Sequence, residues 1–282
     1  MLRIGIVLLL LFAFTTTYSQ GYQLTIAFGE MNYQGDLQSS TLTTKLAQSA
    51  FSGYLKYDAG NKLVYRAGLT YGNIYGDDAF NPSPQKERNL NFRSKIGEFQ
   101  VAIEYHFIDG NIHRISPYVF AGLAYFHFDP YTNDTANRQV YLHYFSTEGQ
   151  GLPEYPDRKP YSLNQFAIPF GVGISFRLNC ALSIGAEIGE RKLFTDYLDD
   201  VSKRYVDYNT LLKAKGPLAV KLAYRGPGDY PADINTAYNR GNPKNKDWYY
   251  TGMITLTYHF SGCSFGKVVN SGSQYSCPKR VL

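Results

Sequence analysis

The sequence predicts an all-β protein, an eight-stranded antiparallel up-and-down transmembrane β-barrel, and three observations lead to this class. Apolar and polar residues alternate with a period of two in several segments, as in strands with one lipid-facing and one lumen-facing side. Short and long connections alternate between these segments. Aromatic residues make up 16% of the chain, and many fall near expected strand ends, as in the aromatic girdles of membrane proteins.

The clearest alternation lies in four segments, of which Trp248 to Phe260 is typical. Every second residue from Gly252 onward is apolar or glycine, whereas the residues between them are mostly small and polar. Clean splits of this kind are the primary sequence signal for a strand. The other three segments are 98–107, 165–177 and 181–191.

Weaker patterns predict four further strands and the connections between them. The pattern of 116–128 has aromatic residues on both faces and does not orient that strand, whereas the other three turn their apolar residues outward. With an even number of strands both chain ends lie in the periplasm and the long loops face outside. The further strands are at about 22–33, 48–57, 63–76 and 116–128; short connections are expected at 58–62, 108–114 and 179–180, and long ones at about 34–47, 77–91, 129–161 and 195–247.

Charged residues of the strands fall on the faces that the alternation turns inward. A soluble lipocalin-like barrel would instead fill its interior with apolar side chains. Charges inside a barrel must pair with one another or with water, and turning them inward leaves an apolar belt that lipid would cover. The predicted lumen charge network comprises Lys56, Arg66, Glu98, Glu104, Arg177, Glu187 and Arg191.

The chain divides into three parts. Residues 1–19 read as a signal peptide, with Arg3 before an apolar run and small residues before the expected cut. The barrel is expected over 20–260, ending on Phe260, the place of the aromatic that closes the last strand of such barrels. The net charge of +5 comes from scattered residues, so no nucleic-acid partner is indicated. We therefore expect export to the cell outer membrane.

The remaining segment, 261–282, is a basic and aromatic tail on the periplasmic side. It is either a frayed terminus or a docking element for a periplasmic partner. The chain has three cysteines, so at least one is unpaired, and Cys263 with Cys277 is the candidate local disulfide in an oxidising compartment. The state of Cys180 stays open.

No catalytic, cofactor or metal site is predicted. An eight-stranded barrel is filled by its own side chains, so a pore is not expected. His106 and His259 fall on inward faces near the periplasmic rim, with Glu104 beside His106. We interpret both as hydrogen-bonded lumen histidines, because neither a nucleophile nor a substrate route is evident.

The acidic segment 196–207 is the other candidate site. It lacks the ligand spacing of an EF-hand. Leu198, Val201 and Tyr205 recur at helical spacing, and this predicts an amphipathic loop helix rather than a metal site.

Four stretches resemble one known family: MNYQGDL (31–37), RNLNFRSKIGEF (88–99), STEGQGLPEYPDRKPYSL (146–163) and ERKLFTDYLDDVSKRYVD (190–207). Together with the strand order they resemble the PorG-type, DUF6089-like outer-membrane barrels of Bacteroidetes, associated with type IX secretion and gliding. The resemblance implies a non-enzymatic barrel that ties a periplasmic ring, built from a lipoprotein and its partner subunit, to the outer membrane.

Two further function classes stay open, because a fold does not determine a function. One is a small outer-membrane binding or adhesion barrel with no secretion role, and the other is a membrane-embedded enzyme using His106 or His259. The four family-like stretches lie at the end opposite to a periplasmic ring. They therefore bind an outer partner, fold over the barrel mouth, or indicate that the inside–outside assignment is reversed.

Overall fold

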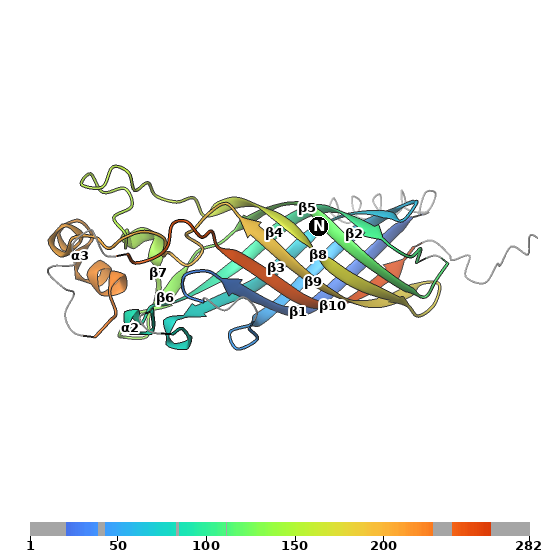
Figure 1. Cartoon of the computed structure of the whole chain (residues 1–282), viewed down its shortest axis with the longest axis horizontal. Helices are drawn as coiled ribbons and strands as arrows, with labels where there is room; N and C mark the ends of the chain where they lie inside the picture. The colour runs from blue at the N-terminus through green and yellow to red at the C-terminus, as the bar shows by residue number, and fades with distance from the viewer. Residues whose placement is uncertain (1–20, 39–42, 83–84, 111, 228–238, 261–282) are drawn as a thin grey trace, which may run out of the picture.

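Eight long antiparallel strands form a closed barrel (Figure 1). The computed structural model describes residues 21–38, 43–82, 85–110, 112–227 and 239–260. The first and last strands pair with each other, and pairing between β3 and β4 completes the circle, so the predicted class is confirmed. The strands are β1 (Tyr22–Gln34), β2 (Gln48–Gly60), β3 (Leu63–Asp77), β4 (Asn91–His106), β5 (Ile115–His127), β8 (Asn164–Arg177), β9 (Leu182–Leu193) and β10 (Trp248–His259).

The outer face of the barrel is an apolar belt. Phe28, Leu69 and Ile254, on three different strands, each expose about two thirds of their surface, at 65%, 65% and 66%. A continuous belt of such residues far exceeds the apolar patches of soluble proteins. The lipid-facing alternation expected from the sequence therefore describes the outer surface.

The strand β4 begins earlier than the segment 98–107 that carried its pattern. In its first half Phe92 and Ile96 point inward and are fully buried, while Arg93 and Lys95 point outward and are exposed. Here the apolar residues face inward and the charged residues face outward, because the strand extends beyond the apolar belt and lines a packed interior. The alternation with a period of two continues, but the apolar and polar faces exchange sides.

The strand β5, which the sequence left without an orientation, turns part of its aromatic residues into the lumen. Tyr118, Phe120 and Phe126 are buried, whereas Leu123 and Tyr125 face outward. The inward rings are retained because they pack against lumen side chains: the guanidinium of Arg66 lies 3.7 Å from the ring centre of Phe120.

The two ends of the barrel differ. At the short-turn end, strands β2 and β3 are joined by a tight turn in which Asn61 and Lys62 have positive φ values of 52° and 69°, as a two-residue hairpin requires. The long-loop end carries several small elements. These are η1 (Asp78–Phe80), α2 (Gln85–Arg88), β6 (Tyr131–Asn133), β7 (Gln139–Tyr141), η2 (Leu142–Phe145) and α3 (Tyr208–Ala223).

The predicted helix over 196–207 is wrong, and the helix α3 follows it instead. In the predicted segment the backbone N–H groups of Leu198 and Val201 donate to the carboxylates of Asp247 and Asp199. These bonds compete with the helical pattern. The helix begins where the Asp207 side chain accepts from Thr210 N at 2.8 Å, an N-cap arrangement.

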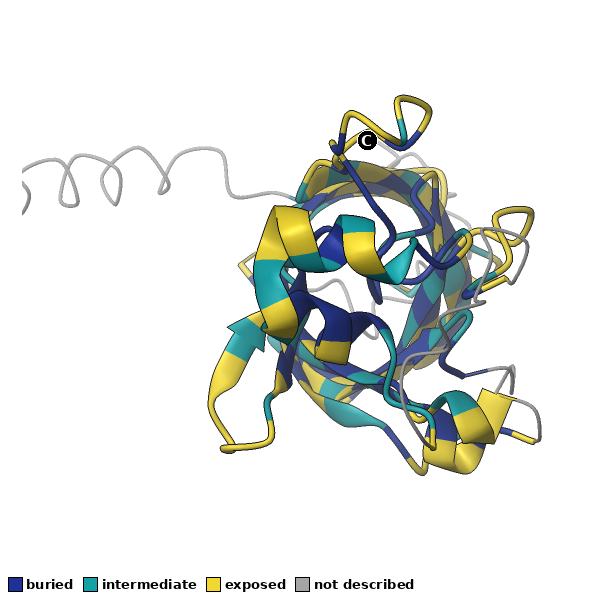
Figure 2. Cartoon of the chain, turned by 90° about the vertical axis from the view of Figure 1, so that its left-hand side faces the viewer, coloured by how far each residue is buried: buried dark blue, intermediate teal, exposed yellow. Residues whose placement is uncertain are grey.

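The long loops fold over the barrel opening, as the end-on view shows (Figure 2). We call residues 128–163, 194–227 and 239–247 the cap. Its apolar core includes Leu152, Val206 and Leu211, with α3 packed across the end. Within the described ranges, no helix has the length and apolar character needed to cross a membrane. The expected signal peptide and the tail 261–282 lie outside the described residues.

Candidate functional site

A chain of four buried charges crosses the lumen on its short-turn side. Lys56 Nζ lies 2.7 Å from Glu104 Oε1, and Arg66 Nη1 lies 3.1 Å from the same oxygen. Arg66 Nη1 also lies 2.6 Å from Glu187 Oε2, which accepts a further bond from the Tyr118 hydroxyl at 2.9 Å. The four charges come from β2, β3, β4 and β9, so their pairing ties distant strands together.

A second ion pair lies further toward the long-loop end. The Arg191 guanidinium donates to both carboxylate oxygens of Glu98, at 3.1 and 3.2 Å. Glu98 also accepts from the Tyr249 hydroxyl at 2.5 Å, and Arg191 donates to Thr251 Oγ1 at 2.7 Å. Bidentate pairs of this kind are geometrically specific. Both charges are fully buried.

Arg177 is the one residue of the predicted network that the structure places apart. It lies at the short-turn mouth, and no Asp or Glu among the described residues forms an ion pair with it within 4.0 Å. Its guanidinium contacts His259 Nδ1 at 3.3 Å, and His259 Nε2 contacts Ser183 Oγ at 2.8 Å. Because a guanidinium only donates, Nδ1 accepts, which makes His259 a neutral lumen histidine.

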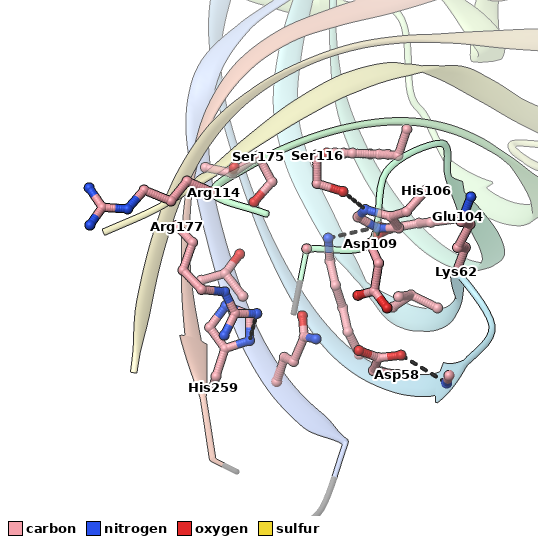
Figure 3. A pocket seen from close by; sticks show the side chains of 18 residues that line it. Asp58, Lys62, Glu104, His106, Asp109, Arg114, Ser116, Ser175, Arg177 and His259 are labelled. Atoms are coloured by element: carbon pink, nitrogen blue, oxygen red, sulfur yellow. Dashed lines mark hydrogen bonds and ion pairs between the residues drawn. The ribbon is translucent and has the colours of Figure 1, made fainter. Parts of the chain in front are cut away.

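The short-turn mouth is a polar pocket open at the barrel end (Figure 3). Charged side chains of both signs line it, among them Lys62, Arg114, Asp58 and Asp109. It ends on the inner side at the ion pair of Lys56 and Glu104. The mouth is therefore a polar recess that is open to solvent and closed on its inner side, rather than the entrance to a channel.

One constellation in the mouth has the residue types of a catalytic triad. Ser116 Oγ lies 2.7 Å from His106 Nδ1, and His106 Nε2 lies 3.2 Å from Glu104 Oε2 (Figure 3). Ser116 Oγ also lies 2.5 Å from the carbonyl oxygen of Ile108, to which it donates. A serine has a single hydroxyl proton, and this residue is 2% exposed. The Ser116 hydroxyl thus donates its one proton to the β4–β5 turn, which it stabilises. Because the side chain is buried, a substrate cannot reach it.

Ser116 was not predicted from the sequence, whereas His106 and Glu104 were. The strand pairing explains this contact: His106 lies opposite Tyr118 across the short β4–β5 turn, and this register brings Ser116 next to the histidine ring. The register could not be predicted from the sequence, because it depends on the conformation of that turn.

Toward the long-loop end the lumen is filled by packed side chains. Tyr33 and Phe92 meet edge to face at 4.9 Å between ring centres, and Phe126 stacks on Phe128 at 5.7 Å. All four belong to one buried cluster with Tyr249. This aromatic plug, together with the ion pairs, leaves the barrel interior solid.

A reconstituted barrel is therefore expected to show no ion conductance. In planar lipid bilayers, purified protein inserted at single-molecule density should leave the current at its baseline, because the lumen contains packed rings and paired charges. A general porin, measured in the same bilayers, provides the positive control. Stepwise current increases from this protein would contradict a filled lumen.

The cap is held by a buried polar network. The carboxylate of Glu148 accepts from the backbone N–H groups of Ser202 and Lys203 at 2.9 and 2.8 Å, and it pairs with Arg240 at 3.2 Å. Asp200 accepts from the Tyr161 hydroxyl at 2.8 Å. These bonds join the segments 146–163 and 194–207, which are far apart in sequence.

Burial raises the pKa of several aspartates in the cap. Desolvation raises the pKa of Asp200 to about 6 and that of Asp196 to about 7. Burial and neighbouring carboxylates raise the pKa values of Asp199 and Asp247, whose oxygens both approach the Tyr33 hydroxyl. In the part of the chain that the structure describes, no group of three or more His, Cys, Asp or Glu side chains could hold a metal ion.

Three further predicted residues lie near the chain end. Phe260 is partly exposed, its backbone N–H donates to Tyr22 O at 3.1 Å, and its ring meets that of Tyr258 at 5.1 Å. Cys263 and Cys277 lie outside the described residues. Cys180 itself is disulfide-bonded. The pairing of Cys263 with Cys277 stays a prediction.

A closed eight-stranded barrel with an apolar outer belt and a charged, filled lumen defines an outer-membrane-type β-barrel. The family described as "Domain of unknown function (DUF6089)" matches residues 2–215, and the chain belongs to this family.

Several solved structures are similar to the chain at low sequence identity. Neisserial surface protein A is 10% identical, with 86% of this chain and 98% of that chain covered at a TM-score of 0.42. A major outer membrane protein from Thermus thermophilus is 13% identical, with 85% and 99% covered at 0.41. The N-terminal β-barrel domain of Pseudomonas aeruginosa OprF is 11% identical, with 85% and 97% covered at 0.36. No curated protein matches the sequence.

Proposed function

We propose that this chain is a non-enzymatic outer-membrane component of the type IX protein secretion system, which anchors a periplasmic ring complex to the membrane. The partners would be the ring lipoprotein and its partner subunit, as the resemblance to PorG-type barrels implies. A solid lumen supports a role in holding rather than conducting. The hydroxyl of Ser116, committed to Ile108 O, supports the absence of triad chemistry.

The observation that carries the proposal is that hydrogen bonds join the four family-like stretches to one another at the long-loop end, partly in the barrel wall and partly in the cap. The Tyr33 hydroxyl donates to Asp199 at 2.5 Å, and Arg88 donates to Asp36 O at 2.8 Å. The carboxylate of Glu148 accepts hydrogen bonds from the backbone N–H groups of Ser202 and Lys203 in the 190–207 stretch. These stretches thus have internal partners, which accounts for their distinctive sequence without a partner protein on the long-loop side.

A periplasmic ring would then contact the opposite end of the barrel. There it could reach the turns 58–62, 108–114 and 179–180 and the tail 261–282. Ile112 in the second turn is 69% exposed, and Arg114 beside it is also exposed. An exposed apolar residue next to charges is a common composition for a protein contact.

A pull-down from detergent-solubilised outer membranes, after mild crosslinking, tests this function. The full chain should recover the periplasmic ring subunits. Comparison with a chain ending at Phe260 locates the contact: loss of the subunits places it in the tail, whereas retention places it on the short turns. Recovery of no ring subunit by either chain, with both barrels inserted, would refute the anchor function.

The alternative function is a small outer-membrane binding or adhesion barrel without a secretion role. The specific observation in its favour is the well-packed cap, which presents a fixed surface on the side that long loops usually turn outward. Binding to cells or matrix that depends on the cap, in the absence of any ring subunit, would favour this alternative.

A further inference from the structure

A pocket of about 280 Å³ opens on the surface of the cap, remote from the short-turn mouth. It lies between η2, the loop that follows it, and the helix α3. Its volume is near the lower end of the range for small-molecule sites, about 300–1,000 Å³. We call it the cap pocket, and the side chains that matter below are His143, Tyr144, Gln150, Tyr161 and Lys215.

Two buried nitrogen atoms of this pocket have no hydrogen-bond partner within the described ranges. They are Nε2 of Gln150 and Nδ1 of His143. Gln150 is only 5% exposed, and its Oε1 is already used by the backbone N–H of Glu148 at 3.0 Å. Buried polar groups are rarely left without a partner. An amide donor and an imidazole nitrogen in one pocket together suit a ligand rich in hydroxyl groups.

The floor of the cap pocket is rigid. Tyr161 is stacked between Phe128 and Tyr197, with ring centres 6.1 and 4.8 Å away and both interplanar angles 9°. Its hydroxyl donates to Asp200 Oδ1 at 2.8 Å. A side chain fixed on both faces and at its tip loses little entropy when a ligand binds.

An exposed aromatic ring stands at the edge of this floor. Tyr144 is 65% exposed, although it lies in an ordered 3-10 turn at a packed surface. An aromatic ring offers an apolar face to the C–H groups of a sugar while its hydroxyl stays in water.

The charge of the lining is one-sided. Among the residues that the structure describes, Lys215 is the one Lys or Arg residue that lines the pocket, and no Asp or Glu residue lines it. The Lys215 ammonium donates to the backbone carbonyl of Tyr144 at 3.1 Å. That contact holds the ammonium at the pocket and leaves two of its three protons for other acceptors. An anionic oxygen is the acceptor that such a group binds most strongly.

We propose that the cap pocket binds an acidic sugar, a hydroxyl-rich pyranose unit carrying a carboxylate, such as a uronic acid residue of a surface polysaccharide. Tyr144 contacts the apolar face of the sugar ring. Gln150 Nε2 and His143 Nδ1 bind its hydroxyl groups, and Lys215 Nζ binds the carboxylate. This site does not depend on the proposed secretion role, because it lies in the cap and uses no residue of the short-turn end.

Two matched sugar pairs test the proposal on the full chain in detergent micelles. Methyl glucoside and methyl galactoside are compared with the corresponding methyl uronates by isothermal titration and saturation-transfer NMR. At least one uronate should bind about tenfold more tightly than its neutral counterpart, since an added charge-assisted bond of about 1.4 kcal/mol gives that ratio. Binding of neither uronate, or equal binding of acid and neutral sugars, would overturn the proposal.

Surface variants then assign the contacts. Lys215→Met should bring the ratio between uronate and neutral sugar close to one, and Tyr144→Ala should weaken binding of both. Lys213→Met is the matched control, because Lys213 is exposed on the same helix but does not line the pocket. All three positions are exposed, so the fold, checked by heat-modifiable gel migration, should be retained. A ratio unchanged by Lys215→Met, or a loss equal in Lys213→Met, would refute the assignment.

Discussion

The variant Arg66→Met is expected to destabilise the barrel by about 3–5 kcal/mol, the usual cost of breaking a buried ion pair by removing one partner. Arg66 connects Glu104 to Glu187, and both carboxylates are almost completely buried. Glu104 would keep its bond to Lys56, but Glu187 would lose its cation. Its remaining partner in that cluster is the Tyr118 hydroxyl, which cannot neutralise a charge in the lumen.

Urea unfolding in detergent micelles, followed by heat-modifiable gel migration, measures this loss. The matched control is Arg138→Met on the β6–β7 hairpin, where the arginine side chain is 76% exposed in its pair with Asp134. An ion pair whose arginine is this exposed to solvent contributes less than about 1 kcal/mol, so that midpoint should hardly move. The double variant Arg66→Met with Glu187→Gln should recover part of the loss. Coincident transitions for Arg66→Met and wild type would show that the lumen pairs do not stabilise the barrel.

The second large effect is expected in the cap, which should lose stability as the pH rises from about 4 to about 7. Asp200 ionises near pH 6 in the folded cap because burial raises its pKa, whereas an unfolded aspartate ionises near pH 3.9. Between those values the folded cap binds a proton that the unfolded chain has lost, so the free energy of unfolding falls as pH increases. The difference of about 2 pKa units corresponds to roughly 3 kcal/mol.

Other groups around Asp200 act in the same direction. Asp196, with a pKa raised to about 7, extends the window upward, and burial also raises the pKa values of Asp199 and Asp247. The arginines that face this cluster, Arg88 and Arg240, stay charged throughout the window.

Hydrogen–deuterium exchange of the cap amides at pH 5 and pH 8, corrected for intrinsic exchange, checks the direction. Protection of Leu198 and Val201 N–H should be lower at pH 8, while the amides of β4 in the barrel serve as an internal control. The variant Asp200→Asn should reduce the difference in protection between pH 5 and pH 8. Protection that increases with pH would contradict the buried, protonated state of these aspartates.

The barrel was predictable from the sequence because a membrane strand is governed by local periodicity. In β10 and β8 every second residue faces lipid, and no distant part of the chain is needed to orient them. β5 could not be oriented from its own pattern, because the inward position of Phe120 depends on Arg66 from another strand. The inward position of Phe92 at the start of β4 was not predicted either, because it depends on packing against Tyr33 of another strand.

The candidate sites were predictable only as sets of residues. The alternation indicated which charges point inward, but the pairing of Arg66 with Glu187 rather than with a neighbour on its own strand depends on barrel closure. The helix expected at 196–207 failed for a similar reason. Its backbone donors are taken by Glu148 and Asp247, which are about 50 residues away along the chain and whose positions local propensity does not describe.

The bond between Tyr33 in β1 and the carboxylates before β10 has a consequence for the order of assembly. The bonded residues are 166 and 214 positions apart, and contacts of such long separation form late. Asp247 reaches Tyr33 only when Trp248 lies beside Gln34 in the seam between the first and last strands. The part of the cap that Tyr33 holds can therefore become ordered only after the seam has closed, so protection of that part reports closure of the barrel.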